Sequence, residues 1–254
     1  MDAIQEKPII WITLINNGYV HYTKNFLKSM EINNCSFHLL VYCLDNESMA
    51  ALEGLPNISC LSAKPFMRTT MNKSLTTWKT IDYKRIVFAK LDAIKHTLEK
   101  FKGSTVGYID TDIIVFKDPT PIMLEAMYNN PEAIVISQCD EEGSVCKHIF
   151  ECPNICSGVI VFRQSFITTK ILNYTNMDII KHLTDQHYLT DILKKLNIKY
   201  MTISKDIFVN GSYPGVRDDG RPLILPQTAA LLHYNFMIGA YKEASMKKNG
   251  MWYI

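Results

Sequence analysis

The sequence lacks an excess of either charge, an N-terminal leader pattern and any long apolar run. Its 254 residues carry 27 Lys and Arg against 25 Asp and Glu, a formal net charge of +2. A chain so close to charge balance does not indicate a nucleic-acid-binding surface. The start, MDAIQEKPIIWITLI, has an acidic Asp2 and only a short apolar run, unlike a signal peptide. No stretch approaches the roughly 20 apolar residues of a membrane span, so we expect no such span and a cytoplasmic location.

The sequence also lacks internal repeats, low-complexity tracts and any linker rich in proline, glycine or serine. Hydrophobic residues make up 47% and charged residues 20%, which is the composition of a globular protein. A chain of this length can bury one sizeable α/β core. We therefore expect a single domain.

Seven cysteines occur without a secretory signal, which favours a reducing compartment and free thiols. Four of them lie close together around a histidine: Cys139, Cys146, His148, Cys152 and Cys156. Their spacing lacks the paired two-residue gaps of common zinc sites. We interpret them as small apolar side chains packed in strands and a loop, with a zinc site as the less favoured alternative.

Apolar runs alternate with amphipathic stretches, which indicates a layered α/β domain with a mostly parallel sheet. We predict strands at 8–15, 37–45, 132–138, 157–163, 198–204 and 229–234. We predict helices at 19–32, 47–53, 79–101, 122–128 and 184–196. The stretch 205–228 is rich in glycine and proline and is expected to be a long loop, whereas 242–248 looks like a polar tail.

One of the most apolar stretches, VGYIDTDIIVFKDP (106–119), contains two carboxylates, Asp110 and Asp112. The segment looks like a buried strand, where a carboxylate is costly unless a basic side chain, a metal ion or a break to the surface compensates for it. Residues two positions apart on an extended backbone face the same way. Converging carboxylates suit a hard divalent cation such as Mg²⁺ or Mn²⁺. An Asp-x-Asp alone is a weak motif, and a solvated turn at a strand end is the alternative.

GYIDTDIIVFKDP resembles the Asp-x-Asp segment of GT-A glycosyltransferases, most closely the nucleotide-diphospho-sugar transferase group around glycosyltransferase family 77, with kinship to family 8. The resemblance extends from about Ile9 to Trp252, through ITLINNGYVHYTKNFLKSM, FAKLDAIKHTL, CSGVIVF, TDQHYL and HYNFMIGAYKEASMKKNGMWY. It implies a GT-A, Rossmann-like α/β domain with a mostly parallel central sheet flanked by helices. The half at 8–119 would bind the nucleotide, and the half at 120–254 would bind the donor sugar and the acceptor.

The resemblance also assigns roles to individual residues. Asp110, Asp112 and His233 would hold the metal ion. The other residues implied to contact the donor are Thr13, Asn16, Asn17, Tyr19, Lys90, Thr111, Ser157, Gly158 and Gly239. The residues implied in catalysis are Asp185, Gln186 and Lys242, the last because it would contact the departing diphosphate.

Several of these residues have a simpler explanation that the sequence leaves open. His233 could be a core or surface histidine at a strand end, and Lys90 could be the solvated edge of an amphipathic helix. Asp185 and Gln186 could merely open the helix at 184–196, with Thr184 or Asp185 as its N-cap. The stretch 16–19 could be only a turn, and Lys242 could be one of several solvated lysines.

By resemblance, the protein is expected to be a metal-dependent glycosyltransferase that uses Mn²⁺ or Mg²⁺ and a nucleoside-diphosphate sugar, with UDP favoured. The acceptor would be a glycan, a protein or a lipid, and the anomeric configuration would be retained. Because Gln186 is a poor nucleophile, we favour attack from the face of the departing diphosphate, with Asp185 as the candidate for a double displacement. The chain departs from the family at Cys156, where an asparagine is common, and this affects the donor sugar more than the reaction class.

Two other functions stay open. A catalytically silent nucleotide-sugar-binding protein would keep the same motifs. A sugar-1-phosphate nucleotidyltransferase has a related fold, but it needs a glycine-rich phosphate loop near the first strand. Gly18 is the only glycine in the first 53 residues, which argues against that activity.

Overall fold

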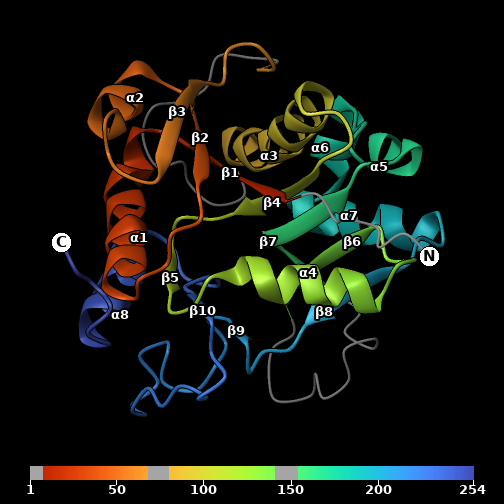
Figure 1. The fold of residues 1–254 in the computed structure, drawn as a ribbon. Helices are drawn as coiled ribbons and strands as arrows, with labels where there is room; N and C mark the ends of the chain where they lie inside the picture. Colours follow the sequence, from red (N-terminus) through yellow and green to blue (C-terminus); the bar gives the residue numbers. More distant parts are fainter. Residues whose placement is uncertain (1–7, 68–79, 141–153) are drawn as a thin grey trace.

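The computed structural model describes residues 8–67, 80–140 and 154–254, which form a central sheet with helices on both faces (Figure 1). The sheet has seven strands in the order β3-β2-β1-β4-β7-β6-β8. These strands are β1 (Ile9–Ile15), β2 (Leu39–Cys43), β3 (Ile58–Ser62), β4 (Thr105–Ile109), β6 (Val135–Cys139), β7 (Ile155–Arg163) and β8 (Tyr200–Ile203). All pairings are parallel except those of β7, which runs antiparallel to β4 and β6. The predicted mostly parallel sheet is therefore confirmed.

The helices enclose a separate apolar core on each face of this sheet. One face carries α1 (Val20–Ile32), α2 (Asn46–Leu52) and α4 (Pro119–Asn129). The other face carries α3 (Ile81–Lys100), α5 (Phe166–Ile171), α6 (Asn176–Lys181) and α7 (Asp185–Lys195). In β1, Trp11 packs into the first core and Ile12 into the second, which explains why its sequence is almost continuously apolar. Among the described residues, no helix is both long enough and apolar enough to cross a membrane.

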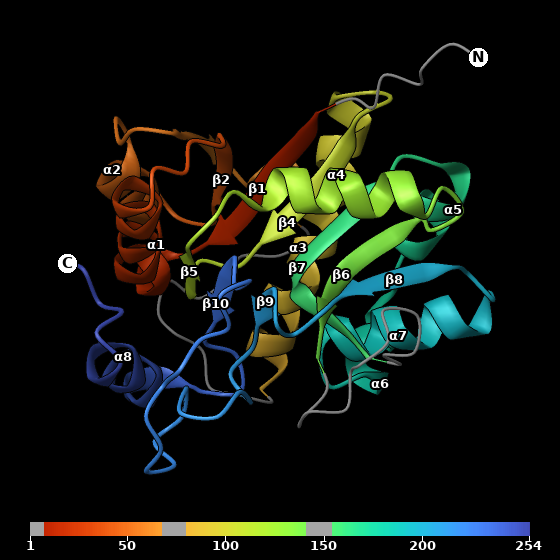
Figure 2. The same ribbon diagram turned by 60° about the horizontal axis from the view of Figure 1, so that its bottom comes forward.

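A second, three-stranded sheet begins at the aspartate pair (Figure 2). Its strands, in order, are β5 (Ile113–Val115), β10 (Leu231–His233) and β9 (Phe208–Val209). Asp110 N still donates to Gly158 O of β7 at 2.7 Å, whereas Asp112 O accepts from Tyr234 N, just after β10, at 3.0 Å. The expectation of one continuous buried strand over 106–116 is therefore wrong, because the two ends of this segment pair with different sheets.

The C-terminal stretch forms a helix, α8 (Gly239–Lys248), where the sequence suggested a polar tail. Its buried residues are Lys242, Ser245 and Met246, so the face that packs inward is largely polar. An amphipathic pattern is therefore missing, and apolar spacing does not predict this helix. Apolar spacing also does not predict the half-buried strand β3 or the six-residue helices α5 and α6.

The cysteines of the described residues do not all have free thiols. Cys139, at the end of β6, is disulfide-bonded, so the expectation of seven free thiols is wrong. That expectation is based on the N-terminal sequence, which does not reveal which thiols lie close to one another. The free cysteines of the described part are Cys35, Cys43, Cys60 and Cys156. The remaining members of the predicted cysteine-rich cluster, Cys146, His148 and Cys152, lie outside the described residues.

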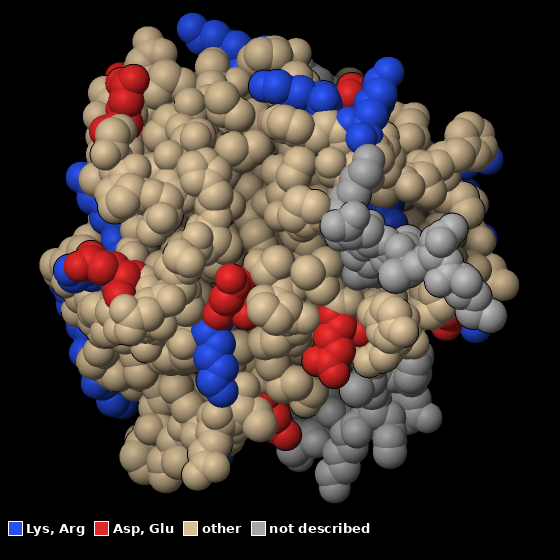
Figure 3. Space-filling model, in the orientation of Figure 1, with Lys and Arg blue, Asp and Glu red and all other residues tan. Residues whose placement is uncertain are grey.

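Charged side chains of both signs are scattered over the face of the molecule in Figure 3. This distribution accords with the nearly balanced net charge. Closely packed opposite charges occur in the interior, where lysines contact Asp110 and Asp112.

Candidate functional site

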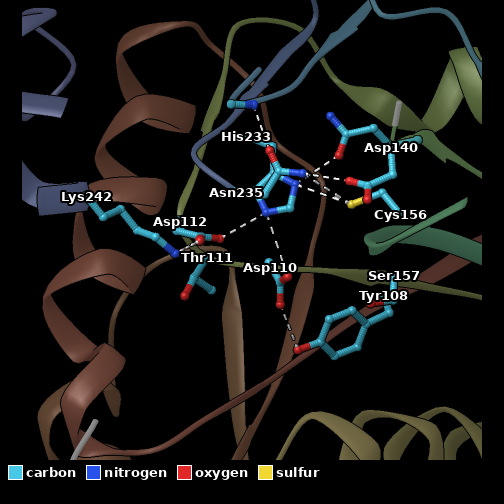
Figure 4. Close-up of polar contacts among 12 residues, drawn as sticks. Tyr108, Asp110, Thr111, Asp112, Asp140, Cys156, Ser157, His233, Asn235 and Lys242 are labelled. Atoms are coloured by element: carbon cyan, nitrogen blue, oxygen red, sulfur yellow. Dashed lines mark hydrogen bonds and ion pairs between the residues drawn. The ribbon is translucent and has the colours of Figure 1, made fainter. Parts of the chain in front are cut away.

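Asp110, Asp112 and His233 come together where the two sheets meet (Figure 4). The two aspartates lie between β4 and β5, and His233 ends β10 opposite Ile113 of β5. One ligand atom from each of the three residues lies within 4.8 Å of the others. His233 Nε2 is 3.3 Å from Asp112 Oδ1 and 3.8 Å from Asp110 Oδ2. The fold thus gathers the three side chains that the sequence suggested as a ligand set.

Two features make this cluster fit a divalent cation. Asp112 is 5% exposed, and its Oδ1 has no hydrogen-bond partner among the described residues, so a buried acceptor is left unsatisfied. Gly158 of β7 lets two of these side chains lie close against the strand, because a Cβ there would lie 2.2 Å from His233 Cε1 and 2.7 Å from Asp110 Oδ2. Two carboxylates and an imidazole form a donor set that can hold a divalent cation.

Two lysines compensate the carboxylates of half-buried Asp110 and buried Asp112. Lys90 of α3 places its Nζ 3.0 Å from Asp110 Oδ1, and Lys242 of α8 forms an ion pair with Asp112 Oδ2. Burial alone would raise the pKa of Asp112, but Lys242 and His233 outweigh burial and hold that pKa well below its usual range. Burial would lower the pKa of Lys242, but the charge of Asp112 raises it above its usual range, so the lysine stays charged. Neither lysine is the solvated side chain that the simpler explanations required.

Four residues implied to contact the donor lie in or just after β1, the neighbour of β4 in the sheet: Thr13 within the strand, and Asn16, Asn17 and Tyr19 after its carboxyl end. Thr13 and Asn16 are buried. Tyr19 lies in a short 3-10 helix, η1 (Asn17–Tyr19), close enough to Lys242 for the lysine charge to act on its hydroxyl. Burial raises the pKa of Tyr19. Asn17, in contrast, is exposed, so the structure brings Tyr19 but not Asn17 to the charged cluster.

Thr111 and Gly239 occupy turns that border the cluster. Thr111 lies between the two aspartates, and its hydroxyl accepts a hydrogen bond from Thr23 of α1 at 3.2 Å. Gly239 begins α8 with a φ of 55°, a left-handed conformation that favours glycine. Lys242 follows three positions later in the same helix and forms the ion pair with Asp112.

Asp185 and Gln186 form the first turn of α7. The N-cap of this helix is Thr184, not Asp185, so capping does not account for the aspartate. Asp185 is 2% exposed, and burial raises its pKa, although the charge of Lys90 opposes this shift. Its Oδ2 has no hydrogen-bond partner among the described residues. Asp185 is therefore a buried carboxylate beside the same lysine that contacts Asp110.

Gln186 joins a polar group that sequence reasoning missed. Its Oε1 accepts from Ser157 N at 3.2 Å, and its Nε2 donates to Asp140 Oδ2 at 2.5 Å. Asn235 donates from Nδ2 to Asp140 Oδ1 at 3.0 Å and lies 3.8 Å from Cys156 Sγ. Burial raises the pKa of Asp140 to about 6, although the hydrogen bond from Gln186 opposes this shift. A carboxylate directly after a predicted strand was the signal for Asp140, because α/β sheets bind ligands at strand ends.

Comparison with known proteins places the chain among sugar-nucleotide enzymes. The family model for nucleotide-diphospho-sugar transferases matches residues 36–253. Mouse xyloside xylosyltransferase 1 is 14% identical with a TM-score of 0.56, over 91% of this chain and 99% of that one. The galactosyltransferase LgtC, solved with donor and acceptor sugar analogs, is 12% identical with a TM-score of 0.53, over 95% of each chain. GlyE of Streptococcus pneumoniae is 14% identical with a TM-score of 0.56, over 96% of this chain and 60% of that one. A search of curated proteins gave no match.

The likeness to these solved structures concerns the fold, and it confirms the predicted GT-A architecture. The family model covers much more than half of the chain, including both aspartates, His233 and Lys242. The chain therefore belongs to the nucleotide-diphospho-sugar transferase family.

Proposed function

We propose that this protein is a metal-dependent glycosyltransferase that moves a sugar from a nucleoside-diphosphate sugar, with UDP favoured, to a glycan, protein or lipid acceptor. The observation that supports this most strongly is the cluster of Asp110, Asp112 and His233, whose ligand atoms lie within 4.8 Å of one another against Gly158. We further assign the nucleotide to the half at 8–119, and the donor sugar and acceptor to the half at 120–254.

Asp110, Asp112 and His233 would hold the cation, Mn²⁺ or Mg²⁺, which when bound supplies positive charge beside the donor diphosphate. Lys242 lies next to Asp112 and would contact the diphosphate as negative charge develops on it during C–O bond cleavage. Its charged form is favoured in the free protein, so the lysine can meet that negative charge without first taking up a proton.

On the sugar side, the side chains support transfer with retention and without a covalent intermediate. Gln186 is a neutral amide held by Asp140 and Ser157, so it is a poor nucleophile. Burial raises the pKa of Asp185, so the surroundings of this carboxyl oppose the charged form that a nucleophile requires. We therefore propose that the acceptor attacks from the face of the departing diphosphate, with Asp185 as the candidate for a double displacement.

Metal-dependent nucleotide binding tests this function. Calorimetry with UDP and GDP should show binding that requires Mn²⁺ in the natural protein and is lost in Asp112→Ala and His233→Ala. Asp218→Ala is the matched control, since Asp218 pairs with Lys248 on the surface. Unchanged affinity in Asp112→Ala would contradict the metal site. Incubation with a panel of nucleotide sugars then identifies the donor by its slow hydrolysis.

A nucleotide-sugar-binding protein without turnover is the second candidate. The same cluster would serve it, because Asp110, Asp112 and His233 can hold a cation and a nucleotide without any turnover. Tight donor binding with neither hydrolysis nor transfer would support this candidate. Hydrolysis that depends on Mn²⁺ would exclude it.

A further inference from the structure

Gln138 is a fully buried polar residue of β6 that lies outside the predicted site residues. The pairing between β6 and β7 shifts register between Ser137 and Gln138. Such a bulge turns a side chain away from the direction that regular pairing would give it. Here the bulge lies at Gln138, whose side chain extends from the central sheet to β9 of the second sheet.

The amide group of Gln138 has one orientation that satisfies its neighbours. Its Nε2 lies 3.0 Å from Phe208 O and 3.1 Å from Val209 O, and both carbonyls can only accept. The –NH₂ end must therefore point at β9, which leaves Oε1 directed at His233. Oε1 lies 2.9 Å from His233 Nδ1 and can only accept, so Nδ1 carries the proton.

With Nδ1 protonated, a neutral His233 has its lone pair on Nε2, the nitrogen that lies 3.3 Å from Asp112 Oδ1. That is the form in which an imidazole can bind a cation between the carboxylates. We infer that Gln138 is a positioning residue that fixes the metal-binding tautomer of His233. This inference rests on the proposed metal site, and it names the group that prepares it.

The remaining neighbour of Nδ1 cannot take over this task. Cys156 Sγ is 3.7 Å from His233 Nδ1, and a thiol both donates and accepts weakly. Without Gln138, Asp112 Oδ1 as an acceptor 3.3 Å from Nε2 would favour the proton on Nε2, so the population with the lone pair on Nε2 would fall. Outer hydrogen-bond partners of metal-binding histidines typically change metal affinity by about 10- to 100-fold.

A direct test is the Gln138→Met substitution, which keeps the length of the side chain and removes its polar atoms. In ¹⁵N-histidine-labelled protein without metal, at mildly alkaline pH, the His233 signal should report protonated Nδ1 in the natural protein. It is identified by its absence in His233→Gln. In Gln138→Met the other tautomer should appear, and Mn²⁺ affinity should fall about 10- to 100-fold.

Two further variants separate positioning from stability. Asn130→Met removes another buried amide, which donates to Ala126 O at 2.8 Å, and it should lower stability without changing Mn²⁺ affinity. Gln138→Glu keeps an acceptor for Nδ1–H, so it should keep affinity within about threefold of the natural protein despite losing donors to β9.

The outcomes are distinguishable from those that test the function. An unchanged His233 tautomer and unchanged Mn²⁺ affinity in folded Gln138→Met would overturn the role of Gln138. A natural protein that shows the expected tautomer but binds no Mn²⁺ would instead overturn the proposed metal site. Equal loss of affinity in Gln138→Met and Asn130→Met would reduce Gln138 to a structural residue.

Discussion

Lys242 and Asp112 form a buried ion pair although they are 130 positions apart in the sequence. Asp112 also belongs to the cluster that fits a divalent cation. In the protein without nucleotide, Lys242 and a bound cation would therefore both interact with the carboxylate of Asp112. Once a diphosphate is bound, Lys242 has a second anion to contact. The lysine should consequently oppose binding of the bare cation and assist the reaction.

Lys242→Met should change these two properties in opposite directions. Removing a competing positive charge should strengthen binding of Mn²⁺ alone by about tenfold, or 1.4 kcal/mol. Loss of a contact that forms as charge develops should reduce kcat by about thirty-fold to a thousand-fold. Calorimetry with Mn²⁺ alone and donor-consumption kinetics measure the two effects. Lys248→Met is the control, because its side chain is 45% exposed.

The same substitution should also destabilise the metal-free protein, contrary to what a lysine in a polar tail would do. Removing one partner of a buried ion pair leaves an uncompensated charge and typically costs about 3–5 kcal/mol. Urea denaturation without metal should show this loss, and added Mn²⁺ should restore part of it. Equal effects in Lys242→Met and Lys248→Met would mean that the ion pair with Asp112 contributes nothing.

Gly158→Ala should block the metal site while leaving the other ligands in place. The added Cβ would lie 2.2 Å from His233 Cε1, so the imidazole must move from its position beside the aspartates. Mn²⁺ affinity should fall at least about 100-fold. Val159→Ala, on the same strand, is the control, since it creates a cavity in the core without entering the site. Full Mn²⁺ affinity in a folded Gly158→Ala protein would show that the metal site does not depend on the position of His233 against Gly158.

Asp140 should make stability fall as pH rises. Burial raises its pKa in the folded protein to about 6, from an ordinary 3.8. Between these values the folded state binds more protons than the unfolded state, so the free energy of unfolding decreases with pH. From about pH 4.5 to pH 7 this contribution falls by about 2 kcal/mol, and Asp140→Asn should lack it.

The measurement is urea denaturation of metal-free natural protein and Asp140→Asn at both pH values. The informative quantity is the change in their stability difference, because it cancels the other titrating groups. No change in that difference would mean that Asp140 titrates as an exposed aspartate.

Thiol titration should find two of the seven cysteines unreactive in denaturant without reductant, because Cys139 is disulfide-bonded. Cys139→Ser should free one thiol and keep the number of reactive groups above that of the natural protein. Disulfides are typical of oxidising compartments, so this one does not accord with the expectation of free thiols in a reducing compartment. Seven reactive thiols would contradict the disulfide.

Much of the fold could be predicted because the sheet is buried on both faces. Strands such as β1 and β7 are almost wholly buried and read as apolar runs. Helix α3 buries residues at helical spacing along 20 positions, so its pattern is long enough to detect. β3 is only half-buried, and α8 buries Lys242, whose charge pairs with Asp112. Neither element therefore has a pattern of apolar residues.

The site could be predicted only where its chemistry is visible in a short motif. Two aspartates inside an apolar run can be noticed in the sequence, because burying a carboxylate without compensation costs free energy. Gln138 gives no such indication, and Asp140 gives only its place near the end of a predicted strand, because their partners His233 and Asn235 are each 95 positions away. Those contacts exist only after two sheets have packed together, and a β-bulge at Gln138 is not encoded by any residue pattern that we could recognise.

The passage of the chain from one sheet to the other at residues 110–112 has a consequence for the order in which the protein unfolds. Asp112 is tolerated in the interior only while α8 is docked and supplies Lys242. When α8 detaches, the unpaired carboxylate favours separation of β10 from β5, and the central sheet keeps its own pairings. The docked C-terminal helix thus stabilises the second sheet, and the backbone amide hydrogens of β10 should exchange well before those of β1.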